Sequence, residues 1–98
     1  MELYLRIYEI RPGEMAAWLE EWRAHVLPLR RRFGFEVLGA WASDEASTFS
    51  WLLGYSGPEG IEAANAAYYA SSERKLLDPD PARHILEARE LPVRSLAL

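Results

Sequence analysis

The sequence has no cysteine and only two histidines, His25 and His84. Without cysteine there are no disulfide bonds and no thiolate chemistry, which excludes a small secreted scaffold held together by disulfides. The two histidines lie far apart and show neither His-x-x-x-His nor Glu-x-x-His spacing, so we predict no metal site and no cofactor. Gly-x-Ser-x-Gly and the phosphate-binding loop are also missing, which argues against these two common catalytic motifs.

Excess positive charge and long apolar runs are lacking as well. The formal net charge is −4 and the isoelectric point is near 5.1, whereas a nucleic-acid-binding domain normally has a basic face and a high isoelectric point. No apolar run approaches the ~20 residues of a membrane span. The first residues do not follow the charged-then-apolar pattern of a signal peptide. We therefore predict a cytoplasmic protein that binds neither nucleic acid nor a membrane.

Apolar and aromatic residues are abundant. Half of the 98 residues are hydrophobic, 12% are aromatic, and four are tryptophan. A chain of this length predicts a single domain over residues 1–98. Such a short chain buries only a modest fraction of its surface, and oligomerisation is a common remedy. The number of apolar residues is large for one small core, which indicates that more than one surface of the domain is buried.

The order of predicted elements is β-α-β-β-α-β. Residues 2–10 alternate with a period of two, as a half-buried strand does. A helix follows, and the short polar gap between the strands at 35–42 and 48–55 predicts an antiparallel hairpin. A second helix begins near Pro58, placed at its first position, and residues 82–93 form the last strand. This order is typical of the ferredoxin-like α+β fold.

The first helix extends from about Gly13 to Gly34. Its apolar residues recur at spacings of four and three, as one face of a helix requires. Pro28 falls inside this pattern and predicts a kink, since it removes a backbone hydrogen bond. Arg30, Arg31 and Arg32 form the last turn, where they complement the helix dipole as a solvated cap. The apolar stripe consists of Met15, Leu19, Trp22, Val26, Leu29 and Phe33.

Neither face of the predicted sheet is polar, although two helices cover only one of them. The first strand alone has Leu3, Leu5 and Ile7 on one side and Tyr4, Tyr8 and Ile10 on the other. A sheet with one wet face normally alternates between apolar and polar residues. We therefore predict a homodimer whose sheets pack face to face, a dimeric α+β barrel. Which faces of the second and third strands meet the helices stays open, although we place Phe35, Val37 and Trp41 on one face.

Three passages resemble the NIPSNAP family of the dimeric α+β-barrel (ABM-like) superfamily. They are "LYLRIYEIRPGEMAAWLEEW", "LPLRRRFGFEVLGAW" and "EARELPVRSL". The resemblance implies the βαββαβ fold and the homodimer. The superfamily includes cofactor-free quinol monooxygenases, haem-degrading enzymes, dehydratases and isomerases, so it does not define one activity. Haem-degrading relatives place a helical histidine with asparagine and tryptophan partners, but Asn65, the only asparagine here, lies on the other helix.

The best candidate for a binding site is the face that holds Tyr4, Arg6 and Tyr8. If buried, Arg6 needs a planar anionic partner. This partner is either a protein carboxylate, namely Glu36, Glu87 or Glu90, or a carboxylate or phenolate of a ligand. His25 borders the apolar stripe of the first helix, where it is either a core-edge residue or an acid or base in a pocket. Trp41 completes the candidate binding residues, which are otherwise Tyr4, Arg6, Tyr8 and His25.

Three functions remain open from the sequence. The first is binding of a small, flat, apolar or weakly acidic molecule in a pocket of the homodimer. The second is catalysis by a cofactor-free monooxygenase or isomerase on a phenolic or quinonoid substrate, with His25 or a tyrosine handling the proton. The third is a ligand-free interaction module that uses Arg30, Arg31 and Arg32 to engage an acidic partner.

Overall fold

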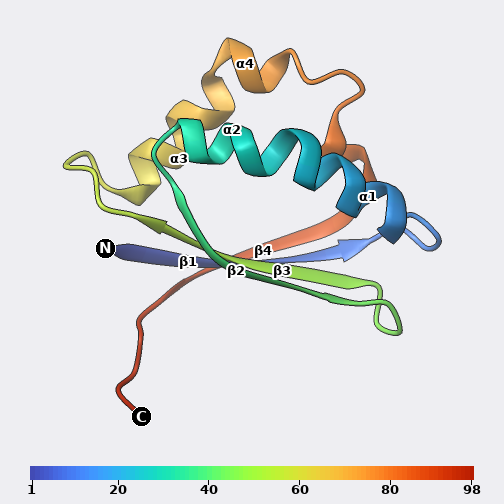
Figure 1. Cartoon of the computed structure of the whole chain (residues 1–98), viewed down its shortest axis with the longest axis horizontal. Coiled ribbons are helices and arrows are strands. Elements are labelled where there is room, and N and C mark those ends of the chain that lie inside the picture. The colour runs from blue at the N-terminus through green and yellow to red at the C-terminus, as the bar shows by residue number, and fades with distance from the viewer.

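The structure, a computed structural model, describes all 98 residues. Its helices lie on one face of a four-stranded sheet, and the other face is left uncovered (Figure 1). The elements are β1 (Glu2–Ile10), α1 (Met15–Glu21), the π-helical segment η1 (Trp22–Val26), α2 (Leu27–Arg32), β2 (Glu36–Ser43), β3 (Thr48–Tyr55), α3 (Ile61–Ala70), α4 (Ser72–Lys75), the 3-10 turn η2 (Pro81–His84) and β4 (Ile85–Val93).

The sheet confirms the predicted ferredoxin-like α+β fold. Its strand order is β2-β3-β1-β4, and all neighbouring strands are antiparallel. The two terminal strands of the chain therefore pair with each other, and the β2–β3 hairpin adds to the free edge of β1. β1 is a central strand, and its side chains face both layers of the molecule.

The kink predicted at Pro28 takes the form of the π-helical segment η1. The backbone N–H of Leu27 bonds to the carbonyl of Trp22, five residues back. In a regular α-helix, the Pro28 ring would collide with the carbonyl four residues earlier. The wider turn just before Pro28 makes room for the ring, so the helical run continues into α2.

The π-helical segment also changes which residues of the first helix are buried. Trp18, Trp22, Val26 and Arg30 are spaced four apart and are all buried, whereas Phe33 of the predicted stripe is only half-buried. The wider turn brings positions four apart onto one face. The interpretation of Arg30 as part of a solvated cap is therefore wrong, because its side chain is 1% exposed.

Gly34 ends α2 as predicted. Its φ is +89°, and the N–H groups of Phe35 and Gly34 bond to the carbonyls of Arg30 and Arg31. This is the Schellman motif, which favours glycine at the left-handed position. Arg31 and Arg32 remain exposed on the last turn, so the run of three arginines presents two charges to solvent.

Two predicted boundaries need correction. Pro58 is not the first residue of the second helix, because it lies in a turn and α3 begins at Ile61 after the cap Gly60. β4 begins at Ile85 instead of Ala82, because the preceding residues form η2. In η2, the Asp80 side chain accepts a hydrogen bond from the N–H of Ala82, and this cap stabilises a short helical turn in place of a strand.

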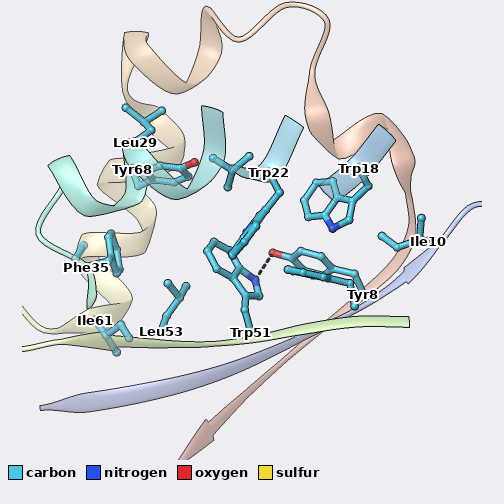
Figure 2. Packing of buried hydrophobic residues seen from close by; sticks show 13 residues of the cluster. Tyr8, Ile10, Trp18, Trp22, Leu29, Phe35, Trp51, Leu53, Ile61 and Tyr68 are labelled. Carbon is cyan, nitrogen blue, oxygen red and sulfur yellow. Dashed lines mark hydrogen bonds between the residues drawn. The ribbon is translucent and has the colours of Figure 1, made fainter. Parts of the chain in front are cut away.

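Aromatic side chains fill the space between sheet and helices. Figure 2 shows Tyr8 and Trp51 rising from the sheet to meet Trp18 and Trp22 of the first helix. The Trp22 and Trp51 rings meet edge to face, with centroids 5.5 Å apart, a favourable geometry for aromatic pairs. Trp18, Trp22 and Trp51 are thus core residues. The core also contains Ile10, Val26, Leu29, Phe35, Phe49, Leu53, Ile61, Ala64 and Tyr68.

A bulge in β2 places Trp41 on the opposite face from Val37, although the sequence pattern placed the two on one face. The register with β3 shifts between Val37 and Gly39, and the extra residue reverses the faces that follow. Trp41 then pairs with Ser50 on the uncovered face, where it is 57% exposed. Its ring lies over Gly39, since a Cβ there would be only 2.7 Å from the indole.

The uncovered face of the sheet is apolar at its centre. The buried Arg6, Tyr8 and Trp51 face the helices, and the residues that alternate with them along the strands face the other side. These are Leu3, Leu5, Ile7, Leu52 and Leu91. The C-terminal residues that follow β4 extend away from the sheet on the same side (Figure 1). None of the helices is long and apolar enough to cross a membrane.

Candidate functional site

Arg6 lies on the face of β1 that the helices cover, where its side chain makes three polar contacts. It is 8% exposed, and its Nη1 pairs with the Glu90 carboxylate, one of the three partners that the sequence predicted. Its Nε donates to the Tyr8 hydroxyl at 2.8 Å, and its Nη2 donates to the Tyr69 hydroxyl at 2.9 Å. The neighbours Tyr8, Tyr69 and Glu90 hold the pKa of Arg6 above its usual value although burial acts to lower it.

Arg30 lies beside Arg6 but has no carboxylate partner. Its Nη1 donates to the Asn65 carbonyl oxygen at 2.8 Å, and its Nη2 donates weakly to the Tyr69 hydroxyl at 3.3 Å. The guanidinium also stacks on the Tyr68 ring, 3.8 Å from its centroid. Burial lowers the pKa of Arg30 below its usual value, and the tyrosine oxygens offset this only in part. We call Arg6, Tyr8, Arg30, Asn65 and Tyr69 the arginine cluster.

The unpartnered polar atoms beside this cluster are mostly hydrogen-bond donors. Four buried side-chain atoms have no partner, and three of them are N–H groups, which can only donate. The Trp18, Arg30 and Tyr68 side chains that supply three of these atoms line one small inner cavity of about 30 Å³. Burial raises the pKa of Tyr68, so its hydroxyl stays a donor at neutral pH. The four atoms are Trp18 Nε1, Trp22 Nε1, Arg30 Nε and the Tyr68 hydroxyl.

The Tyr8 hydroxyl adds a further donor to the inner cavity. Its oxygen accepts from Arg6 Nε at 2.8 Å and from Trp51 Nε1 at 3.1 Å, the second bond being drawn in Figure 2. Because both neighbours donate, the Tyr8 proton is free to be donated in turn. Burial raises the pKa of Tyr8, which keeps this proton in place. The side chains around the cavity thus carry several hydrogen-bond donors among aromatic and aliphatic groups, and an acceptor oxygen suits these donors.

An outer hollow of about 380 Å³ opens beside the inner cavity. Tyr69, Arg74 and Ala82 line both spaces, so they form the boundary between them. The outer hollow lies in the size range of small-molecule sites, whereas the inner cavity has room for only a water or two. Lys75 and Arg74 lie at the hollow, and Arg74 pairs with Asp80 at 2.9 Å. An aromatic ring therefore fits the outer hollow and not the inner cavity.

A second buried polar cluster joins α1 to η2. His84 is 5% exposed, with Nδ1 2.7 Å from Glu14 and Nε2 2.8 Å from Glu21. Both ring nitrogens lie within hydrogen-bond distance of a carboxylate, and the imidazolium form, with its two N–H donors, can bond to both. Arg83 makes two bonds to Glu21, at 2.7 and 2.8 Å, and these lower the pKa of Glu21. We call Glu14, Glu21, Arg83 and His84 the histidine cluster.

The structure brings together some of the residues that the sequence singled out as a site. Arg6 and Tyr8 are in direct contact, and Tyr4 is half-buried on the same face of β1. His25 is exposed and lines a different hollow, of about 390 Å³, that shares no residue with the inner cavity. Trp41 lies on the far side of the sheet. No group of three or more histidine, aspartate or glutamate side chains could hold a metal ion.

Sequence reasoning missed Arg30, Asn65 and Tyr69 as parts of this site. Asn65 and Tyr69 are one turn apart on α3, and they reach Arg30 from 35 and 39 residues away in the sequence. One signal was present, because Trp18, Trp22, Val26 and Arg30 are spaced four apart and a proline within the helix favours a widened turn.

Comparisons with known proteins agree on one family. The NIPSNAP family model matches residues 1–90. An uncharacterized NIPSNAP domain protein from Burkholderia xenovorans has a similar structure, with a TM-score of 0.83 at 15% identity over 99% of this chain and 96% of the other. A NIPSNAP family protein of unknown function from Agrobacterium tumefaciens has a TM-score of 0.83 at 16% identity over 95% and 86%.

A third similar structure has a different description. A protein from Nitrosomonas europaea, described as a candidate antibiotic biosynthesis monooxygenase, has a TM-score of 0.70 at 15% identity over 99% of this chain and all of the other. At this identity the likeness concerns the fold alone. No curated protein matches the sequence.

Proposed function

Because the chain belongs to the NIPSNAP family, whose fold does not define one activity, we propose a function from the geometry of the arginine cluster. The protein binds a small, flat, weakly acidic molecule, and it does so as a homodimer. The acidic group of the ligand bonds to the arginine cluster, and its flat body lies in the outer hollow.

The observation that carries this proposal is the buried charge of Arg30. Its side chain is 1% exposed and has no carboxylate partner, although a buried charge is costly unless it is paired. The donors around the inner cavity also lack acceptors. A ligand carboxylate or phenolate supplies both the missing negative charge and the missing acceptors. Guanidinium groups suit such planar anions because they donate two parallel hydrogen bonds.

Calorimetric titration with a matched pair of ligands tests the proposal. Benzoate carries the required charge, whereas benzamide has nearly the same shape and is neutral. We expect benzoate to bind and benzamide to bind at least about tenfold more weakly, because charge-assisted hydrogen bonds are the stronger ones. Arg30→Met should remove benzoate binding, whereas Arg31→Met, at the exposed neighbour, should leave it unchanged. Equal binding of the two ligands, or no binding of either, would contradict the proposal.

The homodimer is proposed from the uncovered face of the sheet. Leu3, Leu5 and Ile7 of β1 continue into Leu52 of β3 and Leu91 of β4 as one apolar surface. The chain has no further element to cover it, and apolar surface that loses contact with water is the main source of association free energy. A second copy, packed sheet against sheet, covers the face symmetrically.

Light scattering after size-exclusion chromatography tests the homodimer. Wild-type protein at micromolar concentration should have twice the mass of one chain, whereas Leu5→Glu should give the monomer because it places a charge at the centre of the contact. Ala66→Glu introduces the same charge at an exposed position of α3 and should leave the dimer intact. A wild-type monomer under these conditions would rule the dimer out.

A cofactor-free monooxygenase is a second candidate function. It is favoured by the similar fold of the protein described as a candidate antibiotic biosynthesis monooxygenase, and by an arginine cluster that suits a phenolate substrate. In such a reaction dioxygen is the oxidant and the phenolic substrate supplies all four electrons: a ring C–H para to the hydroxyl becomes a carbonyl with one oxygen atom, the phenol becomes the second carbonyl of a quinone, and the other oxygen atom leaves as water. Hydroxylated polycyclic substrates should then consume oxygen faster than in a protein-free solution, and Arg30→Met should reduce that rate. If none of these substrates consumes oxygen faster than it does in the protein-free solution, this candidate function is excluded.

A further inference from the structure

The Tyr69 hydroxyl occupies a distinctive position in the arginine cluster. It lies between the two buried guanidinium groups and accepts from Arg6 Nη2 at 2.9 Å and from Arg30 Nη2 at 3.3 Å. A neutral phenol oxygen thus lies where two positive groups converge. An oxygen with negative charge would make stronger, charge-assisted bonds to both donors.

We propose that the Tyr69 hydroxyl holds the position of a ligand carboxylate oxygen, and that the Tyr69 side chain swings outward when an aromatic monocarboxylate binds. This inference rests on the proposed function and deepens it, since it names the ligand class and the moving part. In the ligand-free protein, Tyr69 acts as a plug between the inner cavity and the outer hollow.

The hydrogen bonds of Arg30 favour this exchange. Its bond to Tyr69 is long for an N–H···O contact, so Arg30 loses little when the hydroxyl leaves, whereas the 2.9 Å bond from Arg6 must be replaced by one to the ligand. Its Nε has no partner within the chain and is buried. A carboxylate near Arg30 can accept from Nη2 with one oxygen and from Nε with the other, the two-bond geometry that guanidinium groups favour.

Tyr69 is the most exposed side chain of the cluster, although its ring contacts Tyr68, with centroids 5.1 Å apart, and lies near the guanidinium groups of Arg6, Arg30 and Arg74. It is 40% exposed, whereas its neighbour Tyr68 is 1% exposed and packs edge to face against Phe33. Tyr69 lies one residue before the end of α3, and no element beyond α3 covers it fully. Rotation of its side chain therefore exposes a ring that already touches solvent and leaves the core in place.

The sizes of the two spaces define the shape of the ligand. The inner cavity, about 30 Å³, accepts a carboxylate only when the Tyr69 hydroxyl leaves. The outer hollow of about 380 Å³ is large enough for one or two aromatic rings. Its wall includes Lys75, which attracts an anion, Arg74, which pairs with the Asp80 carboxylate of the same wall, and Leu77 and Ala82, which suit an apolar ring. An aromatic monocarboxylate fits with its head inside and its ring in the hollow.

Calorimetric titration of benzoate into Tyr69→Phe tests the displacement. The variant lacks the competing hydroxyl but keeps the ring, so we expect it to bind benzoate about five- to tenfold more tightly than wild type, the value of about one hydrogen bond. Tyr55→Phe removes the hydroxyl of a tyrosine outside the cluster, which bonds to Glu59, and should bind benzoate like wild type. Unchanged or weaker binding by Tyr69→Phe would overturn the displacement.

A second measurement follows the side chain itself. Protein labelled with 3-fluorotyrosine gives fluorine resonances for its five tyrosines, and the Tyr69→Phe variant identifies the one from Tyr69. Saturation with benzoate should shift the Tyr69 resonance toward that of a solvent-exposed tyrosine. A Tyr69 resonance that stays in place while benzoate binds would show that the ligand enters without moving Tyr69. In that case the displacement fails and the proposed function stands, whereas no benzoate binding by wild type overturns both.

Discussion

The two buried polar clusters of this chain differ in their balance of charge. In the histidine cluster, the carboxylates of Glu14 and Glu21 face the basic side chains of Arg83 and His84 at 2.7 to 2.8 Å. In the arginine cluster, Arg6 pairs with Glu90, but Arg30 has only neutral partners. The same short chain therefore surrounds one buried basic side chain, His84, with carboxylates and leaves another, Arg30, without one.

This difference separates a structural role from a binding role. Paired charges around a buried side chain hold their elements together, and the loss of that side chain removes the contacts of its partners. The histidine cluster in this way fastens α1 to η2 and the start of β4. A buried cation without a counter-charge adds little to stability but is ready to receive an anion. The comparison assigns structure to the histidine cluster and binding to the arginine cluster, and four variants test this assignment.

The largest effect is expected for His84→Ala. It removes a buried ring and leaves Glu14 without its partner, while Glu21 keeps its bonds to Arg83. We expect the free energy of unfolding to fall by about 3 kcal/mol, which lowers the melting temperature by roughly 15 °C in a domain of this size. Thermal denaturation at one fixed protein concentration measures it. Benzoate binding by the folded variant should be retained.

His25→Ala is the matched control for this variant. It removes the only other histidine, which is exposed on η1. A change of about 0.5 kcal/mol or less is expected, as for most surface substitutions. Similar losses for the two histidines would mean that the contacts of His84 do not fasten α1 to η2.

Arg30→Met should give the opposite pattern to His84→Ala. Methionine fills much of the same space among the aromatic rings, and no carboxylate is stranded when the charge is removed. We expect the free energy of unfolding to stay within about 1 kcal/mol of wild type, because replacing a buried charge by an apolar side chain is often neutral. Urea denaturation measures this. A loss as large as that of His84→Ala would mean that Arg30 is a structural cation, which removes the contrast between the clusters.

Much of this fold was predictable from local sequence, because it depends on local patterns. The alternation in residues 2–10 and the polar gap between 43 and 48 indicate strands and a hairpin by their period and spacing. The pairing of Arg6 with a protein carboxylate was also predictable, because a buried charge requires a partner. Gly34 at the end of α2 was predicted for the same kind of local reason, the left-handed backbone that a helix C-terminus needs.

The features that were not predicted arise from single-residue shifts and from distant contacts. The bulge between Val37 and Gly39 reverses the faces of β2 and sends Trp41 to the uncovered side. The π-helical segment before Pro28 has a similar effect on the first helix, because it turns Arg30 inward. The partners of Arg30 come from α3, and no local pattern in the first helix encodes them. The sequence thus predicts the secondary-structure elements well, and it predicts the contacts between distant side chains poorly.

Glu90→Gln increases the difference between the two clusters, because it adds to the excess of positive charge in the arginine cluster. It removes the one carboxylate that pairs with Arg6, and glutamine keeps the size of the side chain. We expect benzoate to bind roughly threefold more tightly, because the ligand then replaces the counter-charge of two cations and no longer competes with Glu90. Calorimetry against Glu87→Gln, a control on the same strand whose carboxylate makes no ion pair with the cluster, measures the change. Weaker binding would mean that Glu90 orients Arg6 for the ligand.

The smallest effect concerns acid pH and the histidine cluster. Hydrogen bonds from Arg83, and a smaller contribution from His84, lower the pKa of Glu21 below 4.5, against the opposing effect of burial. The unfolded chain therefore takes up this proton first as the pH falls, so Glu21 stabilises the fold fully above pH 4.5 and progressively less below it. The gap in melting temperature between wild type and Glu21→Gln should narrow as the pH is lowered from about 6 to about 3. The narrowing is modest because the Arg83 side chain that pairs with Glu21 is 42% exposed, so solvent screens the pair. A gap that stays constant with pH would mean that the Glu21 carboxylate contributes no charge pairing to the fold, which would remove half of the balance attributed to this cluster.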